Sequence, residues 1–89
     1  TLDMALLDSQ IAVLGNQALN YLVSGNLPPR LGNAHPNIVP YDVFPVADGH
    51  IIIATGNDGQ WRKLCEVLGE AGLADDPAYV DNRSRVKNR

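Results

Sequence analysis

The sequence predicts a chain of the α+β class, and three observations carry this prediction. Residues 2–24 form an apolar stretch without proline, two β-rich runs flank the dipeptide Asp48-Gly49, and apolar residues recur at helical spacing from Trp61 to Leu68. The 89 residues are 45% hydrophobic and 19% charged, which is ordinary for a globular protein and excludes a disordered or collagen-like chain. A core built from so few residues would be marginal on its own.

The stretch from residue 2 to residue 24 is expected to form one long helix. Gly15 is its only internal glycine, and Ser24-Gly25-Asn26 supplies a stop signal. At 1.5 Å per residue, a helix of this length would span roughly 33 Å. Residues 26–40 are rich in Pro, Gly and Asn, so they are expected to form an extended loop.

A β-hairpin is expected next in the chain. Residues 41–46 and 50–55 are rich in β-branched and aromatic side chains, and Ala47-Asp48-Gly49 lies between them. Asp-Gly between two such runs is a strong hairpin signal. Pro45 cannot donate a hydrogen bond to a neighbouring strand, so it is expected at an edge or a bulge.

A second helix is expected over about residues 58–69, with Asn57 or Asp58 as its cap. One apolar stripe at i, i+3, i+4 and i+7 consists of Trp61, Leu64, Cys65 and Leu68. Because Cys65 lies in this stripe, a small core residue is favoured over a nucleophile. The glycines around Asn57 could cradle an anion, but the Lys-Ser/Thr ending of a phosphate loop is absent, which favours plain capping.

The formal net charge of −3 is unevenly distributed, because residues 81–89 hold four basic residues and one acidic residue. Their spacing of two, without aromatic residues between them, is typical of a solvated helix, so nucleic acid is not an expected partner. With Val86 as its only apolar residue, that helix has no face to bury, and we expect a segment of a longer protein. One cysteine and two histidines offer neither a disulfide framework nor a metal site, and no apolar run reaches the roughly 20 residues of a membrane span.

Asp8 is the first candidate functional residue. On a helical wheel it lies within about 20° of Gly15 and Leu19 and about 40° from Ala12. Small neighbours let a ligand approach closely, and a carboxylate among apolar residues is costly unless it is paired. The alternative is a solvated or hydrogen-bonded carboxylate near the helix start, where the macrodipole favours negative charge. The wheel identifies a candidate but no reaction.

The loop over residues 30–41 is the second candidate. It is a long connection dense in special residues, and such loops are often functional when they are ordered. His35 precedes Pro36, which restricts it to an extended conformation. A lone loop histidine is more often a hydrogen-bonded structural residue than a catalyst, so both interpretations stay open.

Five segments, in order, are similar to the family III CoA-transferases (CaiB/BaiF type). They read DMALLDSQ (3–10), RLGNAHPNIVPY (30–41), ADGH (47–50), GNDGQW (56–61), and DDP (75–77) with NR at 82–83 and 88–89. No single motif is decisive, whereas the ordered set is specific and covers essentially the whole chain. The family includes formyl-CoA:oxalate, succinyl-CoA-dependent and carnitine CoA-transferases, together with the related α-methylacyl-CoA racemases.

The resemblance implies a longer protein with a Rossmann-like large domain and a small α+β domain, assembled as an interlocked homodimer. Residues 1–25 would be a helix of the large domain, residues 26–40 a linker and active-site loop, and residues 41–89 the first part of the small domain. The implied location is cytoplasmic, or mitochondrial in a eukaryote, with no membrane partner.

The resemblance also implies a mechanism in which Asp8 is the catalytic nucleophile. It would attack an acyl-CoA thioester and pass through an aspartyl-CoA intermediate to a carboxylic acid acceptor. Gly32, Asn33 and His35 would belong to the substrate loop, although this sequence departs from the glycine-rich loop of the formyl-CoA branch from His35 onward. Coenzyme A thioester is then a substrate, with no tightly bound cofactor and no metal, and the residues that bind CoA are not identified.

Two other readings stay open. In the racemase branch the aspartate acts as an acid and base together with a histidine outside this chain. A non-catalytic association module would instead bury the apolar residues 4–23 against a partner. The isolated 89 residues are expected to be inactive in every case.

Overall fold

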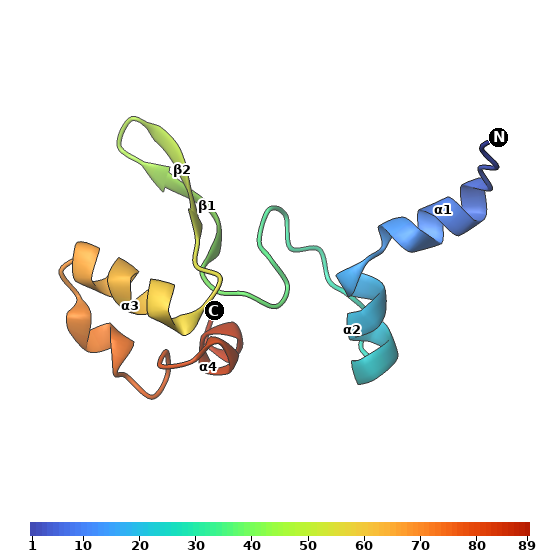
Figure 1. Ribbon diagram of the computed structural model, residues 1–89. Helices are drawn as coiled ribbons and strands as arrows, with labels where there is room; N and C mark the ends of the chain where they lie inside the picture. The colour runs from blue at the N-terminus through green and yellow to red at the C-terminus, as the bar shows by residue number, and fades with distance from the viewer. The chain divides into compact units, whose positions relative to one another are not determined.

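The computed structural model describes all 89 residues, in two compact units, Thr1–Arg30 and Leu31–Arg89. The first unit holds two helices; the second holds an antiparallel hairpin followed by helical elements (Figure 1). This mixture confirms the α+β class. None of the helices is both long and apolar enough to cross a membrane.

The first unit corrects the expectation of one helix over residues 2–24. Helix α1 spans Leu6–Val13 and helix α2 spans Asn16–Ser24, with a break at Gly15. Gly15 has φ 53° and ψ −128°, a conformation that glycine adopts without a steric penalty and that cannot continue a helix. The expected stop is confirmed, because Gly25 closes α2 in the left-handed conformation and its N–H donates to the Tyr21 carbonyl at 2.7 Å.

The expected hairpin is confirmed, with strand β1 at Tyr41–Val46. Strand β2 spans Gly49–Ala54, one residue earlier than expected, because Gly49 pairs with Val46 and only Ala47 and Asp48 form the turn. The register pairs Val46 with Gly49 and Pro45 with His50. Opposed residues alternate between hydrogen-bonded and non-bonded pairs, and the Thr55 N–H donates to the Pro40 carbonyl at 2.9 Å. Counting from this bonded pair, Pro45 falls at a non-bonded position of an edge strand, where its missing N–H costs nothing.

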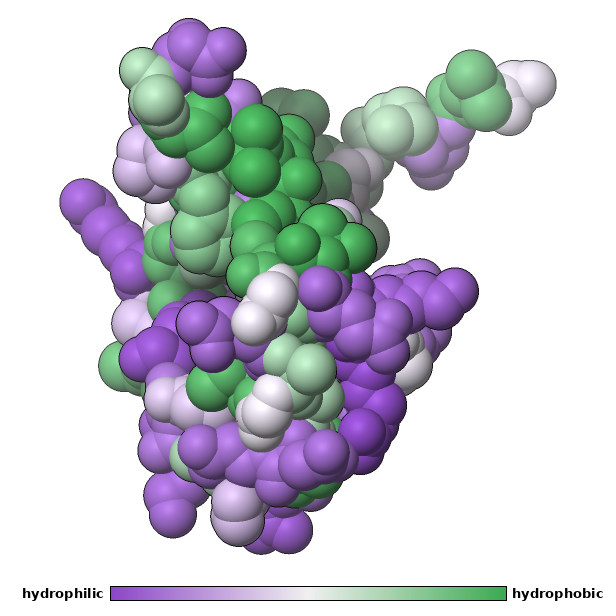
Figure 2. Space-filling model, turned by 90° about the vertical axis from the view of Figure 1, so that its left-hand side faces the viewer, coloured by the Kyte–Doolittle hydropathy of each residue, from purple (hydrophilic) through white to green (hydrophobic).

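Apolar side chains lie on both faces of this hairpin. Opposed residues share a face, so Val43 and Ile52 lie on one face while Phe44 and Ile51 lie on the other. Figure 2 shows apolar residues gathered over the hairpin and mostly hydrophilic residues over the helical part below it. Ile52 is 73% exposed. A two-stranded ribbon of this composition is typical of strands that are covered on both faces.

Helix α3 spans Asp58–Val67, and Asn57 is its cap, as expected. The Asn57 side chain accepts from the Gln60 N–H at 2.9 Å, while the Gln60 side-chain oxygen accepts from the Gly56 N–H at 2.6 Å. These amides are therefore used in capping rather than in holding an anion. Cys65 is fully buried, as the stripe predicted, whereas Leu68, the C-terminal cap residue of α3, is 59% exposed.

The remaining elements are the 3₁₀-helix η1 at Ala71–Ala74 and helix α4 at Asn82–Lys87. η1 packs against α3, and Ala74 is buried there. Asp81 caps α4 by accepting from the Ser84 N–H at 2.7 Å. The expected solvated basic helix is wrong for Arg85, which is 1% exposed. Its guanidinium is buried because several hydrogen-bond partners surround it, as described below.

Candidate functional site

Asp8 lies in the first turn of α1, and its side chain is exposed. Ala5 precedes the helix as its N-terminal cap residue, and Ala12 stands one turn further along. The predicted small-residue stripe therefore holds only within α1. Its continuation to Gly15 and Leu19 is wrong, because the wheel assumes a helix that the structure breaks at Gly15. Asp8 remains an accessible carboxylate near the positive end of a helix.

An apolar groove of about 420 Å³ lies within the first unit. It is lined by Ile11, Leu14, Gln17, Ala18, Tyr21, Leu22 and Pro28. Asp8 does not line this groove. No side chain of α1 or α2 is buried, so these helices present their apolar residues to whatever covers them.

Gly32 and Asn33 form the centre of a tight turn over residues 31–34. The Ala34 N–H donates to the Leu31 carbonyl at 3.2 Å, and both central residues are exposed. Gly32 has φ 61°, where a larger side chain would be strained. The hydrogen bond that closes the turn uses neither of the central N–H groups, which leaves both available to an oxygen acceptor.

His35 is held through its backbone and its ring. Its N–H donates to the Tyr41 carbonyl at 2.9 Å, and its imidazole lies 5.1 Å from the Tyr41 ring, centroid to centroid. The Asn37 N–H donates to His35 Nδ1 at 3.0 Å. Because Nδ1 is an acceptor here, the neutral ring carries its proton on Nε2. His35 therefore presents Nε2–H as a hydrogen-bond donor.

The polar side chains of α4 hold the backbone of this loop. Asn82 Nδ2 donates to the Asn37 carbonyl at 2.7 Å, and Asn82 Oδ1 accepts from the Val39 N–H at 3.1 Å. Arg85 Nε donates to the Val39 carbonyl at 2.7 Å, and Arg89 Nη2 donates to the His35 carbonyl at 2.6 Å. Every second residue of the loop, from 35 to 39, is thus bound from α4 or just beyond its end.

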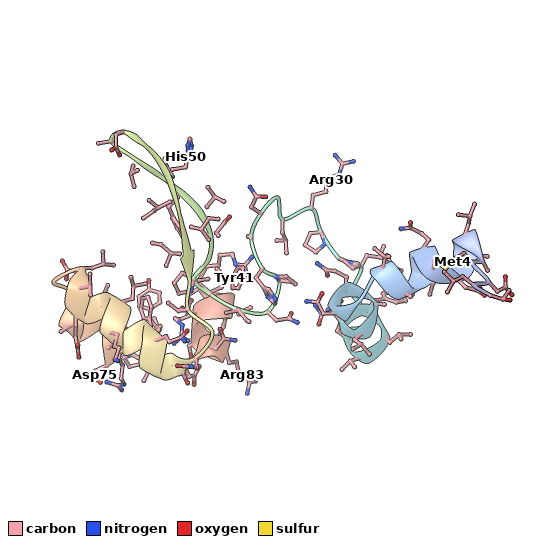
Figure 3. All side chains as sticks on the ribbon, turned by 45° about the horizontal axis from the view of Figure 1, so that its top comes forward. Met4, Arg30, Tyr41, His50, Asp75 and Arg83 are labelled. Atoms are coloured by element: carbon pink, nitrogen blue, oxygen red, sulfur yellow. The ribbon has the colours of Figure 1, made fainter.

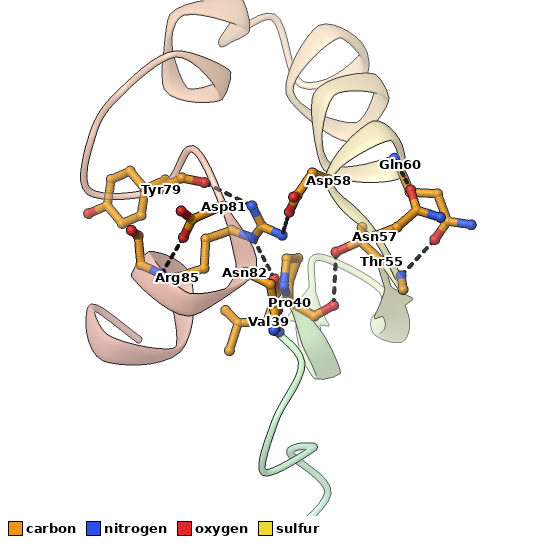
Figure 4. Close-up of polar contacts among 12 residues, drawn as sticks. Val39, Pro40, Thr55, Asn57, Asp58, Gln60, Tyr79, Asp81, Asn82 and Arg85 are labelled. Carbon is orange, nitrogen blue, oxygen red and sulfur yellow. Dashed lines mark hydrogen bonds and ion pairs between the residues drawn. The ribbon is translucent and has the colours of Figure 1, made fainter.

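Arg85 also joins the loop to the rest of the second unit (Figure 4). Its Nη1 donates to the Tyr79 carbonyl at 2.9 Å, and its Nη2 pairs with Asp58 Oδ1 at 2.7 Å. The guanidinium carbon lies 5.2 Å from the centroid of the Trp61 ring. One buried side chain therefore links the candidate loop, the start of α3 and the turn before α4.

Cys65 has the environment of a core residue. Burial raises the pKa of the Cys65 thiol, although the positive charge of Arg85 opposes the shift. The thiol stays protonated at neutral pH, which agrees with the expected structural role. No three His, Cys, Asp or Glu side chains gather as metal ligands.

The four predicted site residues divide between the two units. Gly32, Asn33 and His35 lie together in one ordered loop of the second unit, whereas Asp8 belongs to the first. The sequence reasoning missed the residues that hold this loop, which are Asn82, Arg85 and Arg89. Asn82 and Arg85 lie at i and i+3 on one face of α4, and Arg89 follows two residues after the helix ends. In the sequence, the alternation of basic residues hid the i, i+3 spacing.

The geometry thus defines an α+β segment with an exposed carboxylate at one helix start and an ordered loop bearing histidine and free turn amides. Compared with known proteins, the model of CoA-transferase family III matches residues 1–89. The chain therefore belongs to CoA-transferase family III, and the resemblance read from the five segments is confirmed.

Individual relatives agree with this assignment. The chain is 60% identical over 88 residues to the succinate–glutarate CoA-transferase of Agrobacterium fabrum, covering 99% of this chain and 22% of that protein. It is 41% identical over 88 residues to the human succinyl-CoA:glutarate CoA-transferase, covering 99% of this chain and 20% of that protein. The chain thus spans about a fifth of the length of these curated relatives.

A solved structure shares the fold. The crystal structure of a CaiB/BaiF family protein from Brucella suis is 56% identical to this chain, with a TM-score of 0.68. The match covers 99% of this chain and 23% of that one. The helices and the hairpin accordingly belong to a segment of a larger family fold.

Proposed function

We propose that this chain is part of an acyl-CoA:carboxylate CoA-transferase in which Asp8 is the covalent nucleophile. The observation that carries the proposal is the match to family III along the whole chain, with Asp8 exposed in the first turn of α1. Relatives at 60% and 41% identity are named as transferases that act on dicarboxylic acids, which supports the same substrate class here.

The proposed reaction divides a thioester exchange into carboxylate steps. The Asp8 carboxylate attacks the thioester carbonyl, the C–S bond breaks, and CoA departs as thiolate, which leaves a mixed anhydride between the donor acyl group and Asp8. The thiolate then attacks the aspartyl carbonyl, which releases the donor acid as carboxylate and leaves an aspartyl-CoA thioester. The acceptor carboxylate then attacks the aspartyl-CoA carbonyl and releases CoA as thiolate, which leaves a mixed anhydride between the acceptor and Asp8. The thiolate attacks the acceptor's carbonyl, which forms the new acyl-CoA and releases the Asp8 carboxylate. Each step exchanges one acyl bond for another, so no oxidant or metal is required.

Gly32 and Asn33 are proposed as oxyanion donors of the substrate loop, a role that rests on the family resemblance. Gly32 and Asn33 offer two adjacent N–H groups from a turn whose own hydrogen bond uses neither. Donors that are already oriented stabilise developing negative charge without a reorganisation cost, and removing one such donor typically lowers kcat by about a hundredfold or more.

The wider assembly belongs to the same proposal. CoA thioester enters as a substrate rather than as a bound cofactor, and a carboxylic acid accepts the CoA. A homodimer of complete chains, in the cytoplasm or in a mitochondrion, is expected from the family resemblance. The exposed apolar residues of α1 and α2 support extensive burial of this segment in such an assembly.

The racemase alternative predicts different chemistry. There Asp8 would exchange a proton at the acyl α-carbon and would form no covalent adduct. The transferase names of the relatives favour CoA transfer. Deuterium incorporation at the α-carbon without any carboxylate acceptor would favour the racemase instead.

The decisive experiment replaces Asp8 by Asn in a complete transferase chain that contains this segment. We expect at least a thousandfold loss of CoA transfer, since the nucleophile is removed. With wild-type protein and acyl-CoA, hydroxylamine should convert the activated Asp8 into a hydroxamate, which mass spectrometry locates in its peptide. Asp3→Asn is the matched control, because Asp3 is also exposed and precedes α1. Transfer activity retained by Asp8→Asn would refute the proposal.

A further inference from the structure

The strongest unassigned feature of the molecule is the set of contacts from α4 to the candidate loop. The Asn82 side chain donates to the Asn37 carbonyl and accepts from the Val39 N–H. It thus binds the loop backbone at alternate residues, as a neighbouring β-strand would. Arg89 donates to the carbonyl of His35 itself. A loop bound at alternate residues has few conformations left to lose when a substrate binds.

The ring of His35 is oriented by neighbours within the loop. The Asn37 N–H occupies Nδ1, and Tyr41 packs against the imidazole at a tilt of 50°. Asn37 is the same residue whose carbonyl Asn82 binds. The contact from α4 therefore fixes the peptide segment that selects the Nε2–H tautomer of His35.

The charge around the loop favours an anionic ligand. Four basic residues and one acidic residue lie in residues 81–89, against a net charge of −3 for the whole chain. Two of the basic side chains, Arg85 and Arg89, reach the loop backbone. The charge of Arg85 is paired with Asp58, so Arg89 supplies the positive charge beside His35. A positive charge beside an N–H donor attracts a carboxylate, and a hydrogen bond to an ionised acceptor is about twice as strong as a neutral one.

We propose that Asn82 and Arg89 are positioning residues, which hold His35 so that its Nε2–H donates to the carboxylate of the acceptor acid. This inference rests on the proposed transferase function. Asn82 acts through the Asn37 peptide and Arg89 through the His35 carbonyl, so neither needs to touch the substrate. Arg85 binds the same loop, but it also holds the second unit together and is therefore unsuited to the test.

The test uses a complete transferase chain and measures KM for each substrate and kcat separately. Asn82→Ala and Arg89→Met should each raise KM for the acceptor acid about tenfold, since each removes hydrogen bonds that orient the donor. KM for acyl-CoA should change less than about twofold. Arg89→Lys should restore part of the loss because it keeps a charged donor. Arg89 is exposed, so its replacement leaves the core intact.

Arg83→Met is the matched control. Like Arg89→Met, it removes one positive charge from residues 81–89, but Arg83 is exposed and its side chain points away from the second unit (Figure 3). It should leave both KM values within about twofold. If Arg83→Met raises KM for the acid as much as Arg89→Met does, net charge rather than position is responsible, and the proposal is overturned.

A double-mutant cycle separates positioning from general stability. His35→Phe keeps a ring against Tyr41 but removes the Nε2–H, so it should also raise KM for the acid about tenfold. If Asn82 acts through His35, Asn82→Ala should add little in the His35→Phe background. Long-range ¹H–¹⁵N spectra of the ring should show the Nε2–H tautomer in wild-type protein and a mixture in Asn82→Ala.

Two outcomes overturn the positioning role. One is full additivity of Asn82→Ala with His35→Phe; the other is an unchanged KM for the acid in both Asn82→Ala and Arg89→Met. Asp8→Asn tests the proposed function independently of the positioning role. If Asp8→Asn is inactive and the cycle is additive, only the positioning role fails. If Asp8→Asn remains active, the proposed function itself fails.

Discussion

The two units of this chain differ in how they use their apolar residues. In Thr1–Arg30 no helix buries a single side chain, whereas Leu31–Arg89 encloses Cys65, Ala74, Thr55 and the charged Arg85. Helices α1 and α2 have eight and nine residues, and helices of this length are marginal in water without packing partners. A core requires contacts between distant residues, and in the second unit polar side chains supply many of them. The apolar content of a stretch therefore does not indicate whether its side chains are buried within this segment.

The sharpest test of this difference is Arg85→Met. It leaves the carbonyls of Val39 and Tyr79 without their donor, while Asp58 loses less because its side chain is 53% exposed. We expect a loss of about 3 kcal/mol in the stability of the second unit. Native-state hydrogen exchange of the Thr55 amide, which donates to Pro40, measures this loss. Arg83→Met should change the same quantity by less than about 0.5 kcal/mol.

Leu22→Ala tests whether the first unit is covered in a complete transferase. Leu22 lines the apolar groove and is 75% exposed in this segment. In the 89-residue chain the substitution should change the free energy of unfolding by less than about 0.5 kcal/mol. In a complete chain, where we expect the groove to be filled, the loss should be about 2 kcal/mol. Urea denaturation of both proteins compares the two values, and equal effects would contradict the expected burial.

Asn57→Ala tests a local signal inside the folded unit. The substitution removes the acceptor for the Gln60 N–H at the start of α3 and should cost about 1 kcal/mol. Exchange of the amides in the first turn of α3 measures it. Asn16→Ala is the control, because Asn16 is an exposed helical residue of α2. A similar loss in both variants would show that the cap itself contributes nothing.

The smallest expected effect is the acid sensitivity of α4. The N–H and hydroxyl of Ser84 donate to Asp81 and hold the pKa of this carboxyl below its usual range. The stabilisation is complete when the pH is above the ordinary pKa of an aspartate, about 4, and is lost as the pH falls through the lowered pKa of Asp81. Protection of the Arg85 amide should therefore weaken in acid, and Asp81→Asn should show a flatter pH dependence. An identical pH profile for both proteins would exclude the carboxylate as the cause.

Much of the fold was readable from the sequence where the determinants are local. The dipeptide Asp48-Gly49 predicted the hairpin, Asn57 predicted the start of α3, and the spacing around Cys65 predicted a buried position. The break at Gly15 was missed because a glycine is tolerated within a helix as well as between two. Whether it continues or interrupts the helix depends on packing that a single stretch of sequence does not contain.

The candidate site was readable only in part, for a related reason. The resemblance supplied Asp8, Gly32, Asn33 and His35 without any contact between them. The burial of Arg85 depends on carbonyls at Val39 and Tyr79, which lie 46 and 6 residues away in the chain. Charged residues are almost never fully buried without partners, so a rule based on composition places Arg85 at the surface. Only the tertiary arrangement reveals that the partners exist.

The 46-residue separation between Arg85 and Val39 has a consequence for biosynthesis. A ribosome adds about 5–20 residues per second, so the loop emerges several seconds before the side chain that fixes it. During that interval the hairpin and α3 can form from local signals, while residues 35–40 stay open. The loop proposed to meet the substrate is thus among the last parts of the second unit to acquire its shape.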